Sequence, residues 1–217
     1  MKILIACECS GKVRNTFSAL GHDAHSCDLL PSETPGNHQQ GNVEFFLNAG
    51  WDLMISHPPC TYLSGSGWHW TVRGLRDKKL TDDAIRFAEL LWDAPINKIC
   101  IENPVGMLST MSRLGKPSQI IQPYEFGDDA SKKTCLWLKG LPPLVKDPAK
   151  RFPGRWVEWP KGSGKMAERW SNQTDSGQNK LGPSDKRWMQ RARTYTGIAE
   201  AMAAQWGSNF QKPFSLE

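Results

Sequence analysis

Residues 51–60 read "WDLMISHPPC", an apolar run that ends in two consecutive prolines and a cysteine. The segment "WDLMIS" (51–56) has the composition of a strand that is buried on both faces. Two prolines fix two φ angles and remove two backbone N–H donors, so strand pairing is expected to stop there. Cys60 is therefore predicted to lie on a stiff turn beyond the strand, either as a nucleophile or as an ordinary packed thiol.

Short apolar runs of the same kind recur along the chain and alternate with helical patterns. Helical spacing is found over 12–20 and over 81–92, where Thr81 is a plausible N-cap. The further strand-like runs are "KILIAC" (2–7), "DAHSC" (23–27) leading to Asp28, "KICIE" (98–102) and "TCLWL" (134–138). This alternation predicts an α/β fold, a Rossmann-like sheet with helices on both faces.

Polar residues that are suited to catalysis or ligand binding follow several of these predicted strands. Ser10 and Gly11 come after the first, Cys60 after the third, and Glu102 ends the fourth. Ligands of such sheets bind beyond the carboxyl ends of the strands. We therefore expect an active site where these residues converge.

Composition narrows the class of protein and its compartment. The 217 residues are 39% hydrophobic and 23% charged, which suits a single globular domain over 1–217. The six cysteines are scattered without a CxxC pair, so neither a zinc site nor a disulfide framework is expected. No membrane-length apolar run or signal-peptide layout is evident, and we expect a cytoplasmic protein without membrane contact.

Residues 141–183 interrupt the regular pattern and are predicted to form an irregular insertion, followed by a closing helix over 184–206 with Ser184 as its cap. Between residues 141 and 190 there are ten Lys/Arg against five Asp/Glu, a surplus equal to the net charge of +5 of the whole chain. The segment also holds Trp156, Trp159, Trp170 and Trp188. Such a stretch is suited to a phosphate backbone and stacked bases, or it is a solvated surface with packed tryptophans.

A projecting thiol and a nearby carboxyl group are the requirements of one particular reaction. A thiolate adds to electron-poor carbons such as C6 of a pyrimidine when a neighbouring acid polarises the ring at N3. The addition makes C5 nucleophilic, so that an electrophilic methyl group can be transferred to it. "PPC", "ENP" and "CSG" supply the thiol, the carboxyl group and a donor loop.

The motifs "SHPPC", "IENPVG" and "YEFGDDASKKTCLWL", with the tail "RTYTGIAEAMAAQW", resemble those of cytosine-5 DNA methyltransferases. The likeness covers residues 3–138 and 184–206 and is strongest to short phage and prophage members of that family. The resemblance implies S-adenosylmethionine as cofactor, DNA as partner and no metal. For a phage-encoded member it implies the host cytoplasm.

The resemblance also assigns roles to individual residues. Cys60 is implied as the nucleophile and Glu102 as the acid that holds the base. Substrate contacts are implied for Pro59, Asn103, Pro104, Lys132 and Thr134. Cofactor contacts are implied for Ser10, Gly11, Asp28, Asn42 and Pro58. Lys132 and Thr134 replace paired arginines of the family, and Ile198 replaces an asparagine of its closing motif.

Three functions remain open at this point. The first is methyl transfer to C5 of cytosine in DNA. The second keeps that chemistry but acts on a free pyrimidine nucleotide or on single-stranded nucleic acid, because the family's target-recognition domain is missing or reduced to the insertion. The third is a non-catalytic nucleic-acid binder with a degenerate methyltransferase fold. The recognition sequence and the oligomeric state do not follow from the sequence.

Overall fold

A computed structural model describes residues 1–184 and 187–207. Its centre is a seven-stranded sheet in the order β3-β2-β1-β4-β5-β7-β6. The strands are β1 (Lys2–Ala6), β2 (Asp23–Asp28), β3 (His38–Gln40), β4 (Leu53–Ser56), β5 (Ile99–Pro104), β6 (Gln119–Ile121) and β7 (Thr134–Lys139). Neighbouring strands from β3 to β5 are parallel, whereas β7 runs antiparallel to both β5 and β6. The predicted α/β sheet is confirmed.

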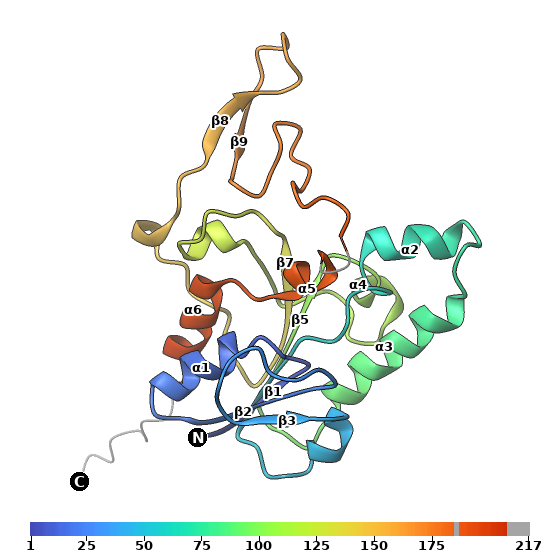
Figure 1. Ribbon diagram of the computed structural model, residues 1–217, viewed down its shortest axis with the longest axis vertical. Coiled ribbons are helices and arrows are strands. Elements are labelled where there is room, and N and C mark those ends of the chain that lie inside the picture. The colour runs from blue at the N-terminus through green and yellow to red at the C-terminus, as the bar shows by residue number, and fades with distance from the viewer. Residues whose placement is uncertain (185–186, 208–217) are drawn as a thin grey trace.

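Helices cover both faces of this sheet (Figure 1). On one face lie α1 (Lys12–Ala19) and α6 (Thr196–Gly207), and on the other α3 (Lys78–Trp92). The remaining helices are α2 (Gly65–Val72), α4 (Leu108–Met111) and α5 (Arg187–Ala192), with 3-10 turns at Val43–Phe46, Pro123–Phe126 and Pro148–Lys150. Two separate apolar layers result, because successive strand residues point to opposite faces.

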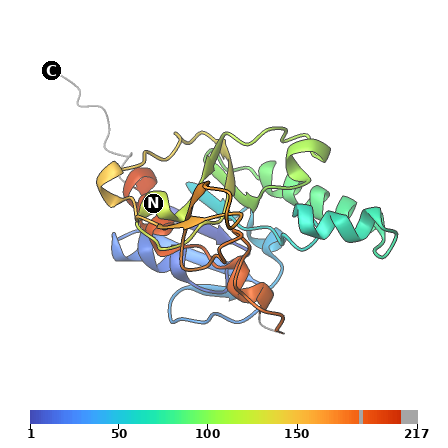
Figure 2. The ribbon, with the colours of Figure 1, turned by 90° about the horizontal axis from the view of Figure 1, so that it is seen from above.

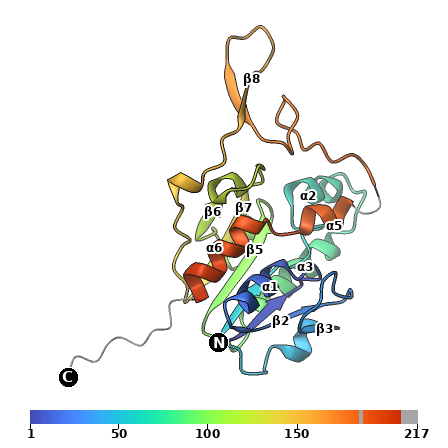
Figure 3. The ribbon, with the colours of Figure 1, turned by 60° about the vertical axis from the view of Figure 1, so that its left-hand side comes forward.

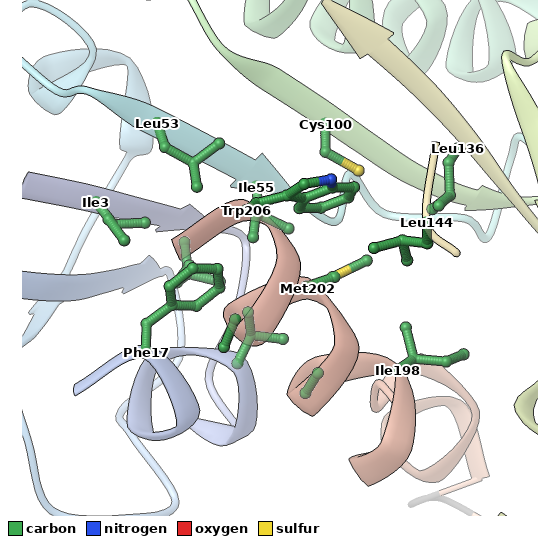
Figure 4. Packing of buried hydrophobic residues seen from close by; sticks show 14 of the residues in the cluster. Ile3, Phe17, Leu53, Ile55, Cys100, Leu136, Leu144, Ile198, Met202 and Trp206 are labelled. Carbon is green, nitrogen blue, oxygen red and sulfur yellow. The ribbon is translucent and has the colours of Figure 1, made fainter. Parts of the chain in front are cut away.

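The layer beneath α1 and α6 shows how the closing helix is held (Figure 4). Phe17 of α1 and Met202 and Trp206 of α6 pack against strand residues that include Ile55 and Cys100. Trp206 is 1% exposed, and its Nε1 donates a hydrogen bond to the Pro142 carbonyl at 3.0 Å. The predicted apolar stripe of the closing helix is thus buried against the sheet.

Two predicted helices differ from the structure. Helix α3 begins at Lys78 with Asp77 as its N-cap, whose Oδ1 accepts from Lys79 N, and Thr81 lies inside the helix. The closing segment is two helices, α5 and α6, rather than one, and residues 185–186 beside the predicted cap Ser184 lie outside the described part of the chain. The helix breaks between Ala192 and Thr196, where the chain turns toward the sheet edge.

The segment 141–183 is more regular than predicted. It contains a β-hairpin formed by β8 (Arg155–Glu158) and β9 (Met166–Arg169), which projects from the body of the molecule (Figures 1 and 3). The view in Figure 2 shows the same hairpin above the sheet rather than beside it. Within the described ranges, no helix is both long and apolar enough to cross a membrane.

We predict that Trp206→Ala lowers the free energy of unfolding by about 3–5 kcal/mol, because it empties a fully buried indole site and removes its hydrogen bond. Urea denaturation followed by circular dichroism measures this change. Trp156→Ala is the matched control, since the side chain of Trp156 is 64% exposed and its loss should change stability by less than about 0.5 kcal/mol. Equal effects of the two substitutions would contradict the packing described.

Candidate active site

The registers of the parallel strands bring four polar residues into one row. Ala6 pairs with both Cys27 and Ser56, and Ser56 pairs with Ile101. The next residue on each strand therefore stands at the same level of the carboxyl edge. Across the sheet this row reads Asp28, Cys7, His57 and Glu102.

A cavity of about 1180 Å³ opens above this row. Its walls come from the strand ends, from α2, from the loop around Gln173–Leu181 and from the segment Arg187–Tyr195. Six residues with predicted site roles line it: Ser10, Asp28, Pro59, Cys60, Pro104 and Lys132. Of the residues expected to converge at the strand ends, Ser10 and Cys60 line this cavity, whereas Gly11 and Glu102 do not.

The turn that carries Cys60 is tied down from outside, because its two prolines offer no N–H groups. The last ladder bond of β4 runs from His57 N to the Ala6 carbonyl at 2.9 Å. Asn103 Nδ2 then donates to the Pro58 carbonyl at 2.8 Å. Beyond the prolines, the Cys60 carbonyl accepts from Leu63 N and Ser64 N, which starts the turn into α2. Cys60 is left partly exposed at the cavity wall.

Glu102 lies directly behind the cavity wall rather than on it. Its carboxylate is 7% exposed, and Oε2 is 3.1 Å from His57 Nδ1 and accepts from Thr194 Oγ1 at 3.2 Å. Burial alone would raise the pKa of Glu102, but the His57 imidazole and the Lys132 ammonium outweigh it and lower that pKa. Both His57 and Thr194 line the cavity, so Glu102 is one side chain removed from it.

The other predicted site residues are also set back from the cavity. Pro58 and Asn103 hold the Cys60 turn through the hydrogen bond described above. Thr134 is buried on β7, where its hydroxyl donates to the Lys132 carbonyl. Asn42 caps the 3-10 turn that begins at Val43, accepting from Glu44 N at 3.1 Å.

Gly11 is set back for a steric reason. It adopts a left-handed conformation (φ 69°) at the start of α1, and a Cβ there would lie 2.2 Å from Thr34 Oγ1. The loop that contains Thr34 is held by the fully buried Arg14 guanidinium, which donates to the hydroxyls of Ser26, Ser32 and Thr34. The first loop is therefore filled by the protein's own side chains.

Glu8 was not anticipated from the sequence, although an acidic residue directly after a buried strand is a visible signal. It is 5% exposed, lines the cavity and caps α1, with Oε1 accepting from Val13 N at 2.8 Å and Oε2 from Arg14 N at 3.3 Å. These N–H groups are the ones that bind phosphate in dinucleotide-binding folds. A carboxylate in their place disfavours a pyrophosphate ligand.

The charges around the cavity are divided between its two sides. Glu8, Asp28 and Glu33 lie on the side of β1 and β2. Four cationic residues come from the segment before β7 and from α5, namely Lys132, Lys133, Arg187 and Arg191. Arg187 Nε is buried and has no hydrogen-bond partner among the described residues. Arg76 and Arg193 also line the cavity, and Arg193 pairs with Glu33, so the unpaired negative charge lies mainly with Asp28 and Glu8.

Comparison with known proteins finds similarity to solved structures alone. No protein-family model and no curated protein matches the chain. A matching solved structure from E. coli is described as a "putative DNA modification methyltransferase encoded within prophage", with 14% identity and a TM-score of 0.41. The match covers 64% of this chain but only 46% of the other. The chain thus spans less than half of that protein, and so distant a likeness carries no functional conclusion.

We predict that iodoacetamide labels Cys60 well before Cys27, Cys100 and Cys135 in the folded protein. Cys60 is partly exposed, whereas burial removes the other three from the reagent and raises the pKa of their thiols. Peptide mass spectrometry at successive times gives the rate at each site. Labelling of Cys100 at the rate of Cys60 would contradict the described geometry, and urea-unfolded protein provides the control in which all rates converge.

Proposed function

We propose that the protein transfers a methyl group from S-adenosylmethionine to C5 of cytosine in DNA. One observation carries the proposal. Cys60 is partly exposed on a turn that Asn103 fixes, and the buried Glu102 precedes Asn103 on the same strand. A nucleophilic thiol and a carboxyl group at adjacent strand ends suit addition to a pyrimidine ring. The motif resemblance described above supports the same reaction.

Each residue then has a defined part in the chemistry. The Cys60 thiolate forms a bond to C6 of the base, while the protonated form of Glu102 supplies a proton to N3 and so neutralises the charge that the addition places on the ring. The bound cofactor supplies the electrophilic methyl group that C5 takes up. Water takes the proton from C5, the bond between C6 and Sγ breaks, and the proton on N3 returns to Glu102, which releases the methylated base and the Cys60 thiolate.

The acidic side of the cavity supports the proposed cofactor. S-adenosylmethionine carries a sulfonium and an ammonium group, and Asp28 offers a carboxylate on that side, whereas Glu8 already caps α1 and Glu33 is paired with Arg193. Asp28 ends β2, where acidic residues of nucleotide-binding sheets accept from ribose hydroxyls. Ser10 lines the same side, and Gly11, Asn42 and Pro58 would support the site from behind.

The basic side and the hairpin support a nucleic-acid substrate. Arg151 and Arg155 are already ion-paired with Glu168 and Asp175, so they stabilise the insertion rather than offer free charge. Lys161 and Lys165 at the hairpin tip form no ion pair with any described residue, and neither do Lys150 and Lys180 elsewhere in the insertion. Trp156 and Met166 on the hairpin are 64% and 57% exposed, which suits contact with bases or sugars.

The base of the hairpin is built to hold it in place. The rings of Tyr124 and Trp170 stack with centroids 3.9 Å apart, and the Arg151 guanidinium lies over the Tyr124 ring at 5.3 Å. Trp170 Nε1 also donates to the Phe152 carbonyl. A rigid arm beside the cavity would grip duplex DNA while a flipped cytosine enters between Pro59, Pro104 and Lys132.

A second function is favoured by the small size of this arm. One two-stranded hairpin takes the place of a recognition domain, and several of its cations are internally paired. The same chemistry would then act on a free pyrimidine nucleotide or on single-stranded nucleic acid. Parallel assays with duplex DNA, single-stranded DNA, RNA and dCMP distinguish the substrates, and no transfer to any of them would favour the non-catalytic binder.

We predict that DNA containing 5-fluorocytosine traps the protein covalently in the presence of S-adenosylmethionine. Fluorine at C5 leaves no proton to remove, so the bond between Cys60 and C6 persists after methyl transfer. Mass spectrometry of a digest should place the adduct on the peptide that contains Cys60. Cys60→Ser should abolish trapping, because a hydroxyl is a far weaker nucleophile near neutral pH.

Asn103→Ala should reduce the trapping rate without removing it, since Cys60 stays present while its turn loses the hydrogen bond to Pro58. Far-UV circular dichroism confirms that each variant is folded. Normal methylation by Cys60→Ala would show that the thiol only packs, and the proposal would be wrong.

We predict that the double variant Lys161→Ser, Lys165→Ser weakens binding to duplex DNA and flattens its salt dependence. Each lost phosphate contact lowers the slope of log K against log salt by about 0.9. Fluorescence anisotropy at several salt concentrations measures the slope. The charge-matched control is Lys78→Ser, Lys79→Ser on α3, where both lysines pair with aspartates within the helix.

Equal slopes for the hairpin variant and the wild type would show that the hairpin does not contact the duplex. If turnover of dCMP also remained normal in that variant, the free-nucleotide function would be favoured over duplex methylation.

A further inference from the structure

His57 is a buried titratable residue that the chemistry described so far does not use. Its side chain is 11% exposed, it lines the cavity, and Nδ1 lies 3.1 Å from Glu102 Oε2. The register explains the contact, because Ser56 pairs with Ile101 and the next residues on the two parallel strands are His57 and Glu102. Both side chains lie toward the face that α6 covers, where Thr194 precedes that helix.

Among the described residues, one polar atom of each side chain in the His57–Glu102 pair is bonded and the other is not. Oε2 of Glu102 takes both contacts, from His57 Nδ1 and from Thr194 Oγ1, and no group in the described part of the chain bonds Oε1. His57 Nε2 is likewise buried without a partner among the described residues. A histidine kept only to fill space or hold a turn would normally have both ring nitrogens satisfied.

We propose that His57 is a positioning residue for Glu102: it binds Oε2, leaves Oε1 free for the base, and keeps an exchangeable proton on the pair near neutral pH. This inference rests on the proposed function. As the Cys60 Sγ–C6 bond forms, the proton held by the pair passes to N3. Glu102 is left as a carboxylate that accepts the Nδ1–H bond of a neutral His57, so the pair ends with one proton fewer.

The surroundings support a shared proton. The charged or titratable groups that act on the pair are Glu8 beyond β1, Cys100 on β5 and Lys132 before β7. Burial by itself lowers the pKa of His57, but the Glu102 carboxylate and then Glu8 outweigh burial and Lys132, and the pKa is raised. The pair therefore loses its proton only as the pH rises through that raised value.

The first experiment measures the single-turnover rate of methyl transfer as a function of pH. In the wild type the rate should fall as the pH rises through the raised pKa of His57. His57→Gln keeps a donor of similar size but cannot titrate, so the falling limb should move by about one pH unit or more toward acid. Thr194→Val is the matched control, because it removes the other bond to the same oxygen. That bond lowers the pKa of Glu102, so its loss should reduce the rate without moving the limb toward acid.

A falling limb at the same pH in His57→Gln and in the wild type overturns the proposal, whatever the loss in rate. A purely structural role predicts that result, since misplacement of Glu102 would reduce the rate equally at each pH.

The second experiment does not need activity. The chain has five histidines, and an NMR titration of the imidazole signals identifies His57 as the one missing from His57→Gln. Its pKa should lie above the ordinary value in the wild type and fall by more than about one unit in Glu102→Gln, where burial acts without the carboxylate. A His57 signal that Glu102→Gln leaves unmoved overturns the proposal. Absence of methyl transfer with a normally coupled His57 instead overturns the proposed function.

Discussion

The hydrogen bond from Asn103 Nδ2 to the Pro58 carbonyl is the interaction on which the site depends. Two prolines end β4 and offer no N–H groups, so this part of the turn is fixed through the Pro58 carbonyl by a side chain of the neighbouring strand. Asn103 follows Glu102 on β5 and points to the opposite face. A single strand end therefore holds the turn of Cys60 with one residue and presents the carboxyl group with the residue before it.

The sequence predicted the central strands because strands buried on both faces are continuous apolar runs, as in "KILIAC" and "WDLMIS". It did not predict β3 (His38–Gln40) or β6 (Gln119–Ile121), which are three-residue edge strands without such a run. The hairpin of β8 and β9 was not predicted, because its segment is rich in Gly, Pro and charged residues. The break between α5 and α6 could not be read either, because it follows from Thr194 reaching Glu102 across 92 positions.

The predicted site residues that lie at the cavity are those whose strands were located from the sequence. Cys60, Asp28 and Ser10 line the cavity because each lies at or beyond a strand end that the apolar pattern located. Gly11 and Asn42 lie away from it, since Arg14 draws the loop of Thr34 over the first turn and Asn42 is used as a cap. The net charge of the insertion likewise does not show which of its cations are free to bind a ligand. Composition counts Arg151 and Arg155 as free cations, and only their contacts show that both are neutralised by partners.

The segment between α5 and α6 connects the two sides of the cavity. Lys132 Nζ donates to the Arg191 carbonyl, Arg193 pairs with Glu33 at 2.6 Å, and Thr194 bonds Glu102. One short stretch thus contacts the basic side, the acidic side and the carboxyl group in turn. The Arg193–Glu33 pair is exposed and contributes little by itself, whereas the buried Thr194 bond orients Glu102. A ligand that drew Glu33 away from Arg193 would therefore loosen the same stretch that holds Glu102, which gives a physical route from the acidic side of the cavity to that carboxyl group.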